Sequence, residues 1–247
     1  MITQSMGSGQ FAAFDLARVP SPCFVIDEVA LENNLKTLKA LADASGVDIL
    51  LALKAFSMWS LAPLVNQYLS GTCASGLWEA RLARAHYGGQ LTSFSPAYAP
   101  SDVDEIAALS DHMVFNSLTQ VSRFEAQARQ AGCEIGLRMN PEHSEGEVAR
   151  YDPCTGGSRL GQPISQLADA SLDGISGLHM HTLCEQGFAP LQRTIEAVTP
   201  FLHSKKGQFD WLNLGGGHLV TRADYDVDGL AACLRALGDE FKVKTFL

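Results

Sequence analysis

The sequence lacks several features that would assign it to a broad class of protein. No window approaches the ~18 consecutive apolar residues of a membrane-spanning helix, and the N-terminus has no basic segment followed by an apolar core. The six cysteines form no CxxC pair, which argues against a zinc knuckle or a disulfide-dense secreted scaffold. The net charge is -9 and no run of Lys or Arg stands out, so binding of nucleic acid is poorly supported. We therefore expect a cytoplasmic protein that binds neither nucleic acid nor a membrane.

The chain does contain a regular alternation of short apolar runs and amphipathic stretches. Its 247 residues, 46% of them hydrophobic, can bury one large core, which we expect to include Trp59, Trp78 and Trp211. The alternation is typical of parallel strands joined by helices, and the length of the chain suits a TIM-type (β/α)8 barrel. We therefore predict this α/β fold. The predicted strands are residues 24–27, 49–56, 71–75, 91–96, 112–117, 134–140, 174–183, 211–217 and 243–247.

Two stretches show the apolar spacing of amphipathic helices. Residues 30–45 place leucines three and four positions apart, so that one stripe can face a sheet. The second helix follows Ser117, with Thr119 as its predicted cap and Gly132 at its end. A long irregular stretch, residues 141–163, exceeds the length of a passive connection, which predicts a loop that carries function or covers a site.

Polar residues capable of chemistry lie where the predicted strands end. They are Lys54, Ser75, Ser95, Asn116, Arg138, His181 and the run Gly215–Gly217. In a parallel barrel the active site lies at the carboxyl ends of the strands, so these positions predict one shared pocket. The alternative is that strand ends are polar only because they border loops.

Lys54 interrupts an apolar run that a parallel sheet would bury on both faces. A buried ammonium must be paired, neutralised or covalently used, and a neutral amine is a nucleophile toward an aldehyde. The alternative is a lysine at a strand end whose ammonium reaches solvent.

His179 and His181 lie two positions apart on a predicted strand and so share a face. Two imidazoles can bind zinc, but the neighbouring strand ends offer no convincing further ligand. One of them can instead lie against an aromatic cofactor ring while the other packs behind it.

Gly215, Gly216 and Gly217 end an apolar strand, where backbone N–H groups can approach an anion; the same run could also be only a flexible turn. A lysine, a histidine and a glycine run together match the needs of pyridoxal phosphate: an amine for its aldehyde, a partner for its ring and a cradle for its phosphate.

Several motifs make the sequence resemble the fold-III, alanine racemase-like family of pyridoxal-phosphate decarboxylases. They are PSPCFVID, LLALKAF, GTCASGLWEARL, RYDPCTGGSRLG, GLHMHTLCEQ and WLNLGGGHLVTR, which span nearly the whole chain. The loop YDPC…SRLG together with HTLCEQ and GGGH points to the carboxynorspermidine/carboxyspermidine decarboxylase branch. That branch removes carbon dioxide from a polyamine precursor to give norspermidine or spermidine.

The resemblance also implies roles for single residues. Lys54 is expected to carry the cofactor, and His181 to stack on its ring. Gly215, Gly216 and Gly217 are expected to hold its phosphate, with Arg138 as a nearby charge. Cys184 stands where relatives often have a serine near that phosphate, which makes a side-chain hydrogen bond there doubtful. No metal is expected.

By the same resemblance, residues 1–28 form an N-terminal segment whose strand pairs with a separate β-domain, and residues 29–247 form the cofactor barrel. The barrel is expected to stop before its eighth strand is complete. Neither the Glu-Pro-Gly motif into which that strand runs in relatives nor the β-domain is in the sequence. An unclosed barrel would expose a sheet edge. A homodimer is also expected by resemblance.

Three rival functions stay open on the sequence alone. The first is a decarboxylase of another basic amino acid, such as meso-diaminopimelate. The second is a non-catalytic protein that binds pyridoxal phosphate. The third is a zinc hydrolase that uses His179 and His181.

Overall fold

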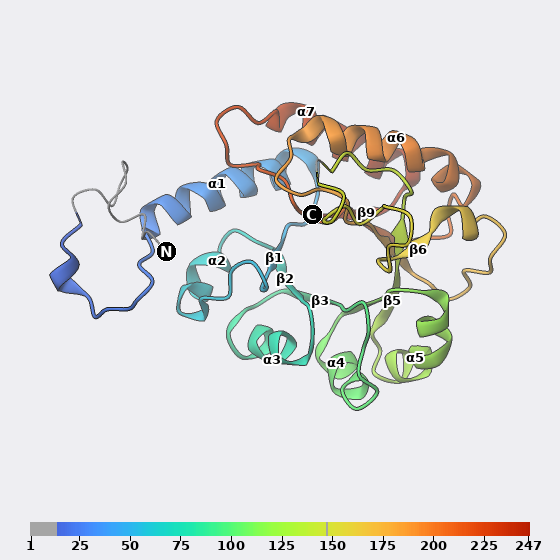
Figure 1. The fold of residues 1–247 in the computed structure, drawn as a ribbon, viewed down its shortest axis with the longest axis horizontal. Coiled ribbons are helices and arrows are strands. Elements are labelled where there is room, and N and C mark those ends of the chain that lie inside the picture. Colours follow the sequence, from blue (N-terminus) through green and yellow to red (C-terminus); the bar gives the residue numbers. More distant parts are fainter. Residues whose placement is uncertain (1–13, 147) are drawn as a thin grey trace.

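A parallel sheet closed into a barrel forms the centre of the computed structural model, which describes residues 14–146 and 148–247. Helices surround the sheet on its outside (Figure 1). Hydrogen-bonded neighbours follow the order β1-β2-β3-β4-β5-β7-β8-β9, and a short β6 pairs with β5 beside this path. The strands are β1 Leu50–Ala52, β2 Gly71–Ala74, β3 Gln90–Phe94, β4 His112–Phe115, β5 Glu134–Asn140, β6 Gln162–Pro163, β7 Gly177–His179, β8 Trp211–Asn213 and β9 Lys244–Phe246. The predicted fold class is confirmed.

The helices connect successive strands and cover the barrel with apolar side chains. They are α1 Glu28–Ser45, α2 Ala62–Val65, α3 Leu77–His86, α4 Val103–Leu109, α5 Leu118–Gln130, α6 Phe188–Ser204 and α7 Val227–Phe241, with 3-10 turns at Leu16–Arg18, Trp59–Leu61 and Ile164–Gln166. The predicted stripe of α1 is confirmed, because Leu35 and Leu41 are buried in the core. No helix in the described part of the chain is long and apolar enough to cross a membrane.

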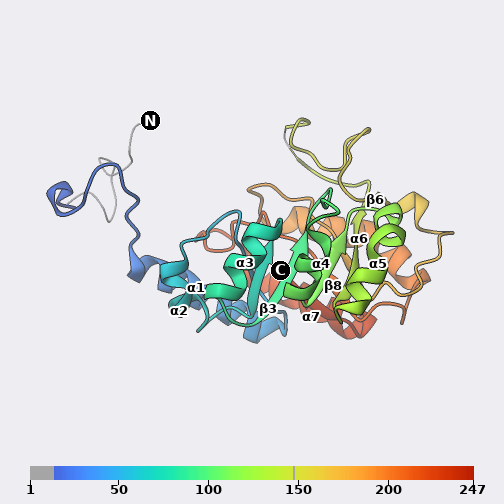
Figure 2. The ribbon, with the colours of Figure 1, turned by 90° about the horizontal axis from the view of Figure 1, so that it is seen from below.

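The strand predicted at residues 24–27 does not form. The segment before α1 runs away from the barrel (Figures 1 and 2), and residues 24–27 belong to no strand. Asp27 instead caps α1, its carboxylate accepting a hydrogen bond from the Ala30 amide at 3.0 Å. The division between residues 28 and 29 stays a prediction, and residues 1–13 lie outside the described residues.

The expected open edge of the barrel is not present. Backbone hydrogen bonds join the segment around β9 to the residues that lead into β1: Asp48 N–H to Thr245 O at 3.0 Å, Leu247 N–H to Asp48 O at 3.0 Å, and Leu50 N–H to Leu247 O at 2.8 Å. Three residues of β9 suffice because the twist of the sheet brings the first and eighth barrel strands together. The barrel is therefore nearly closed.

Aromatic rings fill the barrel interior at the amino ends of the strands. Trp211 is 2% exposed, stacks on His112 with the ring centroids 4.4 Å apart, and meets Phe246 edge to face. The backbones of Gly136 and Gly177 make room for it, because a side chain at either position would collide with the indole. These rings form the floor of the barrel.

Of the three tryptophans predicted to lie in the core, only Trp211 does. Trp59 is 55% exposed and stacks on His86, while Trp78 is 78% exposed beneath the guanidinium of Arg81. Apolar neighbours in the sequence do not show which face of a short helix points outward.

The cap of α5 is Ser117, not Thr119 as predicted. The Ser117 hydroxyl accepts a hydrogen bond from the Gln120 amide at 3.3 Å, and Thr119 is exposed within the first turn. Gly132 follows the helix with φ +75°, as its predicted end requires.

Replacing Ser117 with alanine is expected to lower the free energy of unfolding by about 1 kcal/mol, because the first turn of α5 loses its side-chain acceptor. Thr119→Ala is the matched control and should change stability by less than about 0.5 kcal/mol. Urea denaturation of both variants measures the difference, and equal losses would show that Ser117 is not the cap.

Candidate active site

The predicted polar residues lie at one end of the barrel because all its strands are parallel. Lys54 follows β1, Arg138 lies on β5, His181 follows β7, and residues 215–217 follow β8. The carboxyl ends of parallel strands form a common rim. We call this end the mouth, and the opposite end, closed by Trp211, the floor.

Lys54 lies just beyond the end of β1 and is exposed, which agrees with the alternative of a strand-end lysine that reaches solvent and not with a lysine buried within the strand. The amides of Ala55 and Phe56 both bond to the carbonyl of Ala52, so Lys54 lies within the turn that follows the strand. Its ammonium still acts on the interior: burial chiefly lowers the pKa of His179 and His181, and the Lys54 charge adds to both effects. The amine thus lies within electrostatic reach of both rings.

A row of polar side chains crosses the barrel below the mouth. Register places Arg138 beside His179 and His179 beside Asn213, all facing the interior. The Asn213 side-chain oxygen lies 3.0 Å from His179 Nδ1 and accepts a hydrogen bond from the Gly215 amide at 2.9 Å. His179 is therefore linked through Asn213 to the glycine turn.

Arg138 is a buried cation, 4% exposed. Its guanidinium donates to the His181 carbonyl at 3.2 Å and lies over the Phe94 ring, and no carboxylate in the described part of the chain pairs with it. Burial lowers its pKa to about 10, which leaves it charged at neutral pH. A buried cation in this state favours an anionic ligand.

His181 lies at the rim with its ring held by the glycine turn. Its Nδ1 accepts a hydrogen bond from the Gly216 amide at 3.2 Å, which places the proton of the neutral ring on Nε2. Burial, followed by the charges of Arg138 and Lys54, lowers its pKa to about 4. The ring is therefore uncharged at neutral pH.

The three glycines form a tight turn that comes close to the segment after β7. Gly215 and Gly217 have φ of +73° and +91°. A side chain on Gly215 would lie 2.5 Å from the Met180 carbonyl, and one on Gly217 would collide with the Leu183 carbonyl. At Gly216, by contrast, a side chain would meet nothing within 4 Å, so the turn faces open space at its middle.

The remaining predicted residues are at the rim but not all point to one site. Cys184 is exposed and its amide contacts the Gln186 side chain at 3.4 Å. The Asn116 side chain binds the long loop, donating to Arg159 O and accepting from the Gly161 amide, both at 2.8 Å. Ser75 donates its amide to Glu79, and the Ser95 hydroxyl bonds to Ala97 O. These last three serve local structure.

The long loop predicted at residues 141–163 is confirmed as the largest irregular segment at the mouth, and it projects from the barrel (Figure 2). Glu145 forms a bidentate ion pair with Arg193 on α6 and accepts, through its carbonyl, a hydrogen bond from Gln186 at 2.8 Å. Cys154 lies close enough to raise the pKa of Arg138 against the dominant lowering by burial. The loop is thus fastened beside the site.

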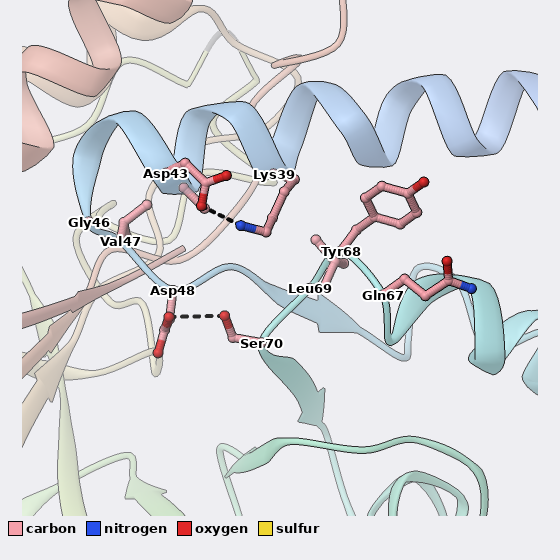
Figure 3. A pocket seen from close by; sticks show the side chains of 10 residues that line it. Lys39, Asp43, Gly46, Val47, Asp48, Gln67, Tyr68, Leu69 and Ser70 are labelled. Atoms are coloured by element: carbon pink, nitrogen blue, oxygen red, sulfur yellow. Dashed lines mark hydrogen bonds and ion pairs between the residues drawn. The ribbon is translucent and has the colours of Figure 1, made fainter.

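A separate pocket of about 430 Å³ lies at the other end of the barrel (Figure 3). Residues 46–48 and 67–70, which precede β1 and β2, line it together with the end of α1. Its polar groups satisfy one another: Lys39 pairs with Asp43, and Ser70 donates to Asp48 at 2.9 Å. This pocket shares no residue with the mouth and is not the candidate active site.

Asparagine 213 and Tyr225 are site residues that the motif analysis did not single out. The signal for Asn213 was present, because an amide side chain interrupts the apolar strand WLNL. The Tyr225 hydroxyl lies 2.9 Å from His218 Nδ1. The two residues are seven positions apart in a loop, where no periodic pattern in the sequence predicts such a contact.

His179 on β7 and His181 after it belong to no cluster of metal-binding side chains in the described part of the chain. Within residues 14–146 and 148–247 there is no group of three or more His, Cys, Asp or Glu side chains that could hold an ion. The Nδ1 atoms of both rings are engaged within the chain, by Asn213 and by Gly216.

Acid is expected to destabilise the protein through His181. Its folded-state pKa lies near 4 against an ordinary 6.5, so the unfolded chain takes up this proton first as the pH falls. Stability from the neutral ring is complete above pH 6.5 and is lost by up to about 3 kcal/mol on going to pH 4. In urea titrations, His181→Gln should therefore lose less stability over this range than the parent; parallel curves would contradict the assignment.

The nearly closed barrel with its polar mouth defines an α/β-barrel protein of the alanine racemase-like kind. The model of the alanine racemase N-terminal domain matches residues 26–183, and the chain belongs to this family. The fold is that of a family that depends on pyridoxal phosphate.

Two relatives and one crystal structure are similar to this chain over most of its length. The chain is 39% identical to carboxyaminopropylagmatine decarboxylase of Synechocystis over 86% of its own length and 55% of that protein's. It is 35% identical to carboxynorspermidine/carboxyspermidine decarboxylase of Campylobacter jejuni, over 93% and 60%. The crystal structure of carboxynorspermidine decarboxylase from Campylobacter jejuni, complexed with norspermidine, superimposes with a TM-score of 0.83 at 34% identity, over 93% of this chain and 59% of that one. The chain thus spans 55% to 60% of the length of these relatives.

Proposed function

We propose that this chain holds pyridoxal phosphate at the mouth of its barrel and serves a decarboxylase that converts carboxynorspermidine or carboxyspermidine to norspermidine or spermidine. The observation that carries the proposal is the meeting, at one rim, of an accessible amine, a neutral imidazole and an open glycine turn. The decarboxylase names of the relatives at 35% and 39% identity support the reaction class.

The residues at the mouth fit pyridoxal phosphate. Lys54 would carry the cofactor, since its amine is exposed at the rim. His181, neutral and fixed by Gly216, would lie against the ring, and the glycine turn would hold the phosphate. When bound, the cofactor supplies an electron-accepting ring that stabilises the negative charge left after loss of carbon dioxide.

The glycine turn and Cys184 offer few free hydrogen-bond donors to a phosphate. The amides of Gly215 and Gly216 already bond to Asn213 and His181, so they orient the turn, and the phosphate would need other donors as well. Cys184 offers a thiol, a weak donor, in place of a hydroxyl. Arg138 supplies a buried positive charge nearby.

The protein's own groups prepare the site before any reaction. Asn213 and His179 hold the turn from below, and aromatic rings fill the floor of the barrel. The neutral rings of His179 and His181 add no positive charge beside Arg138. Lys54 places a primary amine at the rim just after β1, where it would hold the aldehyde group of the cofactor.

A second substrate has specific support. The relative at 39% identity is named for carboxyaminopropylagmatine, which, like carboxyspermidine, joins an amino-acid head to a cationic chain. The net charge of -9 is compatible with either. Decarboxylation of meso-diaminopimelate stays an alternative from the sequence resemblance.

The proposal is tested by measuring release of carbon dioxide, with pyridoxal phosphate present, from four substrates: carboxynorspermidine, carboxyspermidine, carboxyaminopropylagmatine and meso-diaminopimelate. The expected result is turnover of a carboxylated polyamine at a kcat/KM well above that for meso-diaminopimelate. Cofactor binding without turnover of any substrate would favour the non-catalytic reading, and stoichiometric zinc in the purified protein would favour the hydrolase.

The homodimer, the cytoplasmic location and the pairing of residues 1–28 with a β-domain also belong to this proposal. They are supported by the family resemblance. Light scattering of the purified protein tests the dimer.

A further inference from the structure

His218 directly follows the glycine turn and has one ring nitrogen without a partner. Its Nδ1 lies 2.9 Å from the Tyr225 hydroxyl, whereas Nε2 is buried and meets no hydrogen-bond partner in the described part of the chain. Backbone bonds hold the residue in place: the Gln186 amide donates to Gly217 O and the Leu219 amide to Gln186 O, both at 3.1 Å. His218 is therefore fixed between the segments that follow β7 and β8.

The contact with Tyr225 fits the tautomer of His218 that carries its proton on Nε2. A phenol has a single proton to donate, and a neutral imidazole has one acceptor nitrogen and one N–H. When the Tyr225 hydroxyl donates its proton, Nδ1 of His218 is the acceptor, and the imidazole proton therefore lies on Nε2. Burial raises the pKa of Tyr225 to about 12, so the phenol keeps its proton at neutral pH.

His218 also lies within reach of the proposed cofactor site. Burial lowers the pKa of His218 itself to about 4. The pKa of His181 is lowered first by burial, then by the charges of Arg138 and Lys54, and last by His218, so the two rings are near each other. The ring next to the open turn at Gly216 is thus a neutral N–H donor that solvent does not reach.

An unpaired donor in a buried position costs free energy, and a ligand oxygen would remove that cost. We propose that His218 Nε2–H binds the phosphate of pyridoxal phosphate, and that Tyr225 is the positioning residue that keeps the proton on this nitrogen. The inference rests on the proposed function. It supplies one of the donors that the occupied amides of Gly215 and Gly216 do not.

The test compares the affinities of the parent and of His218→Ala for pyridoxal phosphate and for pyridoxal, which lacks the phosphate. His218→Ala should weaken binding of pyridoxal phosphate about tenfold, because a hydrogen bond to a charged group is lost, and leave binding of pyridoxal unchanged. The phosphorus resonance of the bound cofactor should shift as well. His203→Ala, on the exposed end of α6, is the matched control and should change neither affinity.

Two further variants separate contact from folding. His218→Gln, which keeps an N–H donor, should recover part of the lost affinity. Tyr225→Phe should give a smaller loss than His218→Ala, because the ring remains but its proton is free to move to Nδ1.

Three results would overturn the inference. Equal loss of affinity for both ligands in His218→Ala and His218→Gln would show a structural role. Unchanged affinity for both ligands would show that Nε2 does not meet the phosphate. If the parent bound neither ligand, the proposed function would fail and this inference with it; binding by the parent followed by either of the first two results would refute the inference alone.

Discussion

Replacing Lys54 with alanine is expected to abolish covalent attachment of pyridoxal phosphate and to reduce decarboxylation by several orders of magnitude. The reason is positional: Lys54 lies in the turn after β1, and its amine is within electrostatic reach of His179 and His181. Visible absorbance of the bound cofactor measures the first effect. After borohydride treatment, mass spectrometry should find the cofactor on the peptide that contains Lys54 in the parent and nowhere in the variant.

Two variants control this experiment. Lys54→Arg keeps the positive charge but not the primary amine, and should fail as completely as Lys54→Ala. Lys39→Ala removes a lysine that lines the pocket at the other end of the barrel, and should leave the absorbance intact. An unchanged spectrum in Lys54→Ala would refute the role of Lys54 and, with it, the proposed chemistry.

Trp211→Ala is expected to destabilise the protein by about 3–5 kcal/mol, the cost of removing a large buried ring. The indole fills the interior against His112, Phe246 and the bare backbones of two glycines, and its Nε1 donates to Glu134 at 2.8 Å. Since the glycines carry no side chains, they cannot move into the vacated space. Urea denaturation gives the free energy of unfolding.

Trp78→Ala is the matched control for that measurement. Its ring is 78% exposed and contacts Arg81 from one side, so the loss should stay below about 1 kcal/mol. Similar losses for the two tryptophans would contradict the assignment of Trp211 to the barrel floor.

The sequence predicted the barrel well because strand periodicity and helix spacing are local properties. Leu35 and Leu41 on α1 are buried where their spacing placed them, and seven of the parallel strands follow the predicted apolar runs through to β8. The same locality explains the errors. Residues 24–27 have strand composition but no neighbouring strand, and nothing in a local pattern shows that the last strand bonds to residues 48–50.

The sequence predicted that these polar residues lie at one rim of the barrel, but not which contacts they make there. Lysine 54 was expected within a strand, yet the two amides that bond to Ala52 O end the strand earlier, and composition does not show where a strand stops. Asn213 interrupts an apolar run and could have been noticed, but its link to both His179 and Gly215 depends on the register of β7 with β8. Residue roles at the mouth stay predictions until the variants are measured.

The stacked rings of His112 and Trp211 fill the floor of the barrel, so a ligand of the site would enter and leave at the mouth. The loop that Glu145 ties to Arg193 lies beside this mouth. Incoming substrate and outgoing amine would then compete for one passage, so slow departure of the amine should appear as inhibition by the reaction's own product.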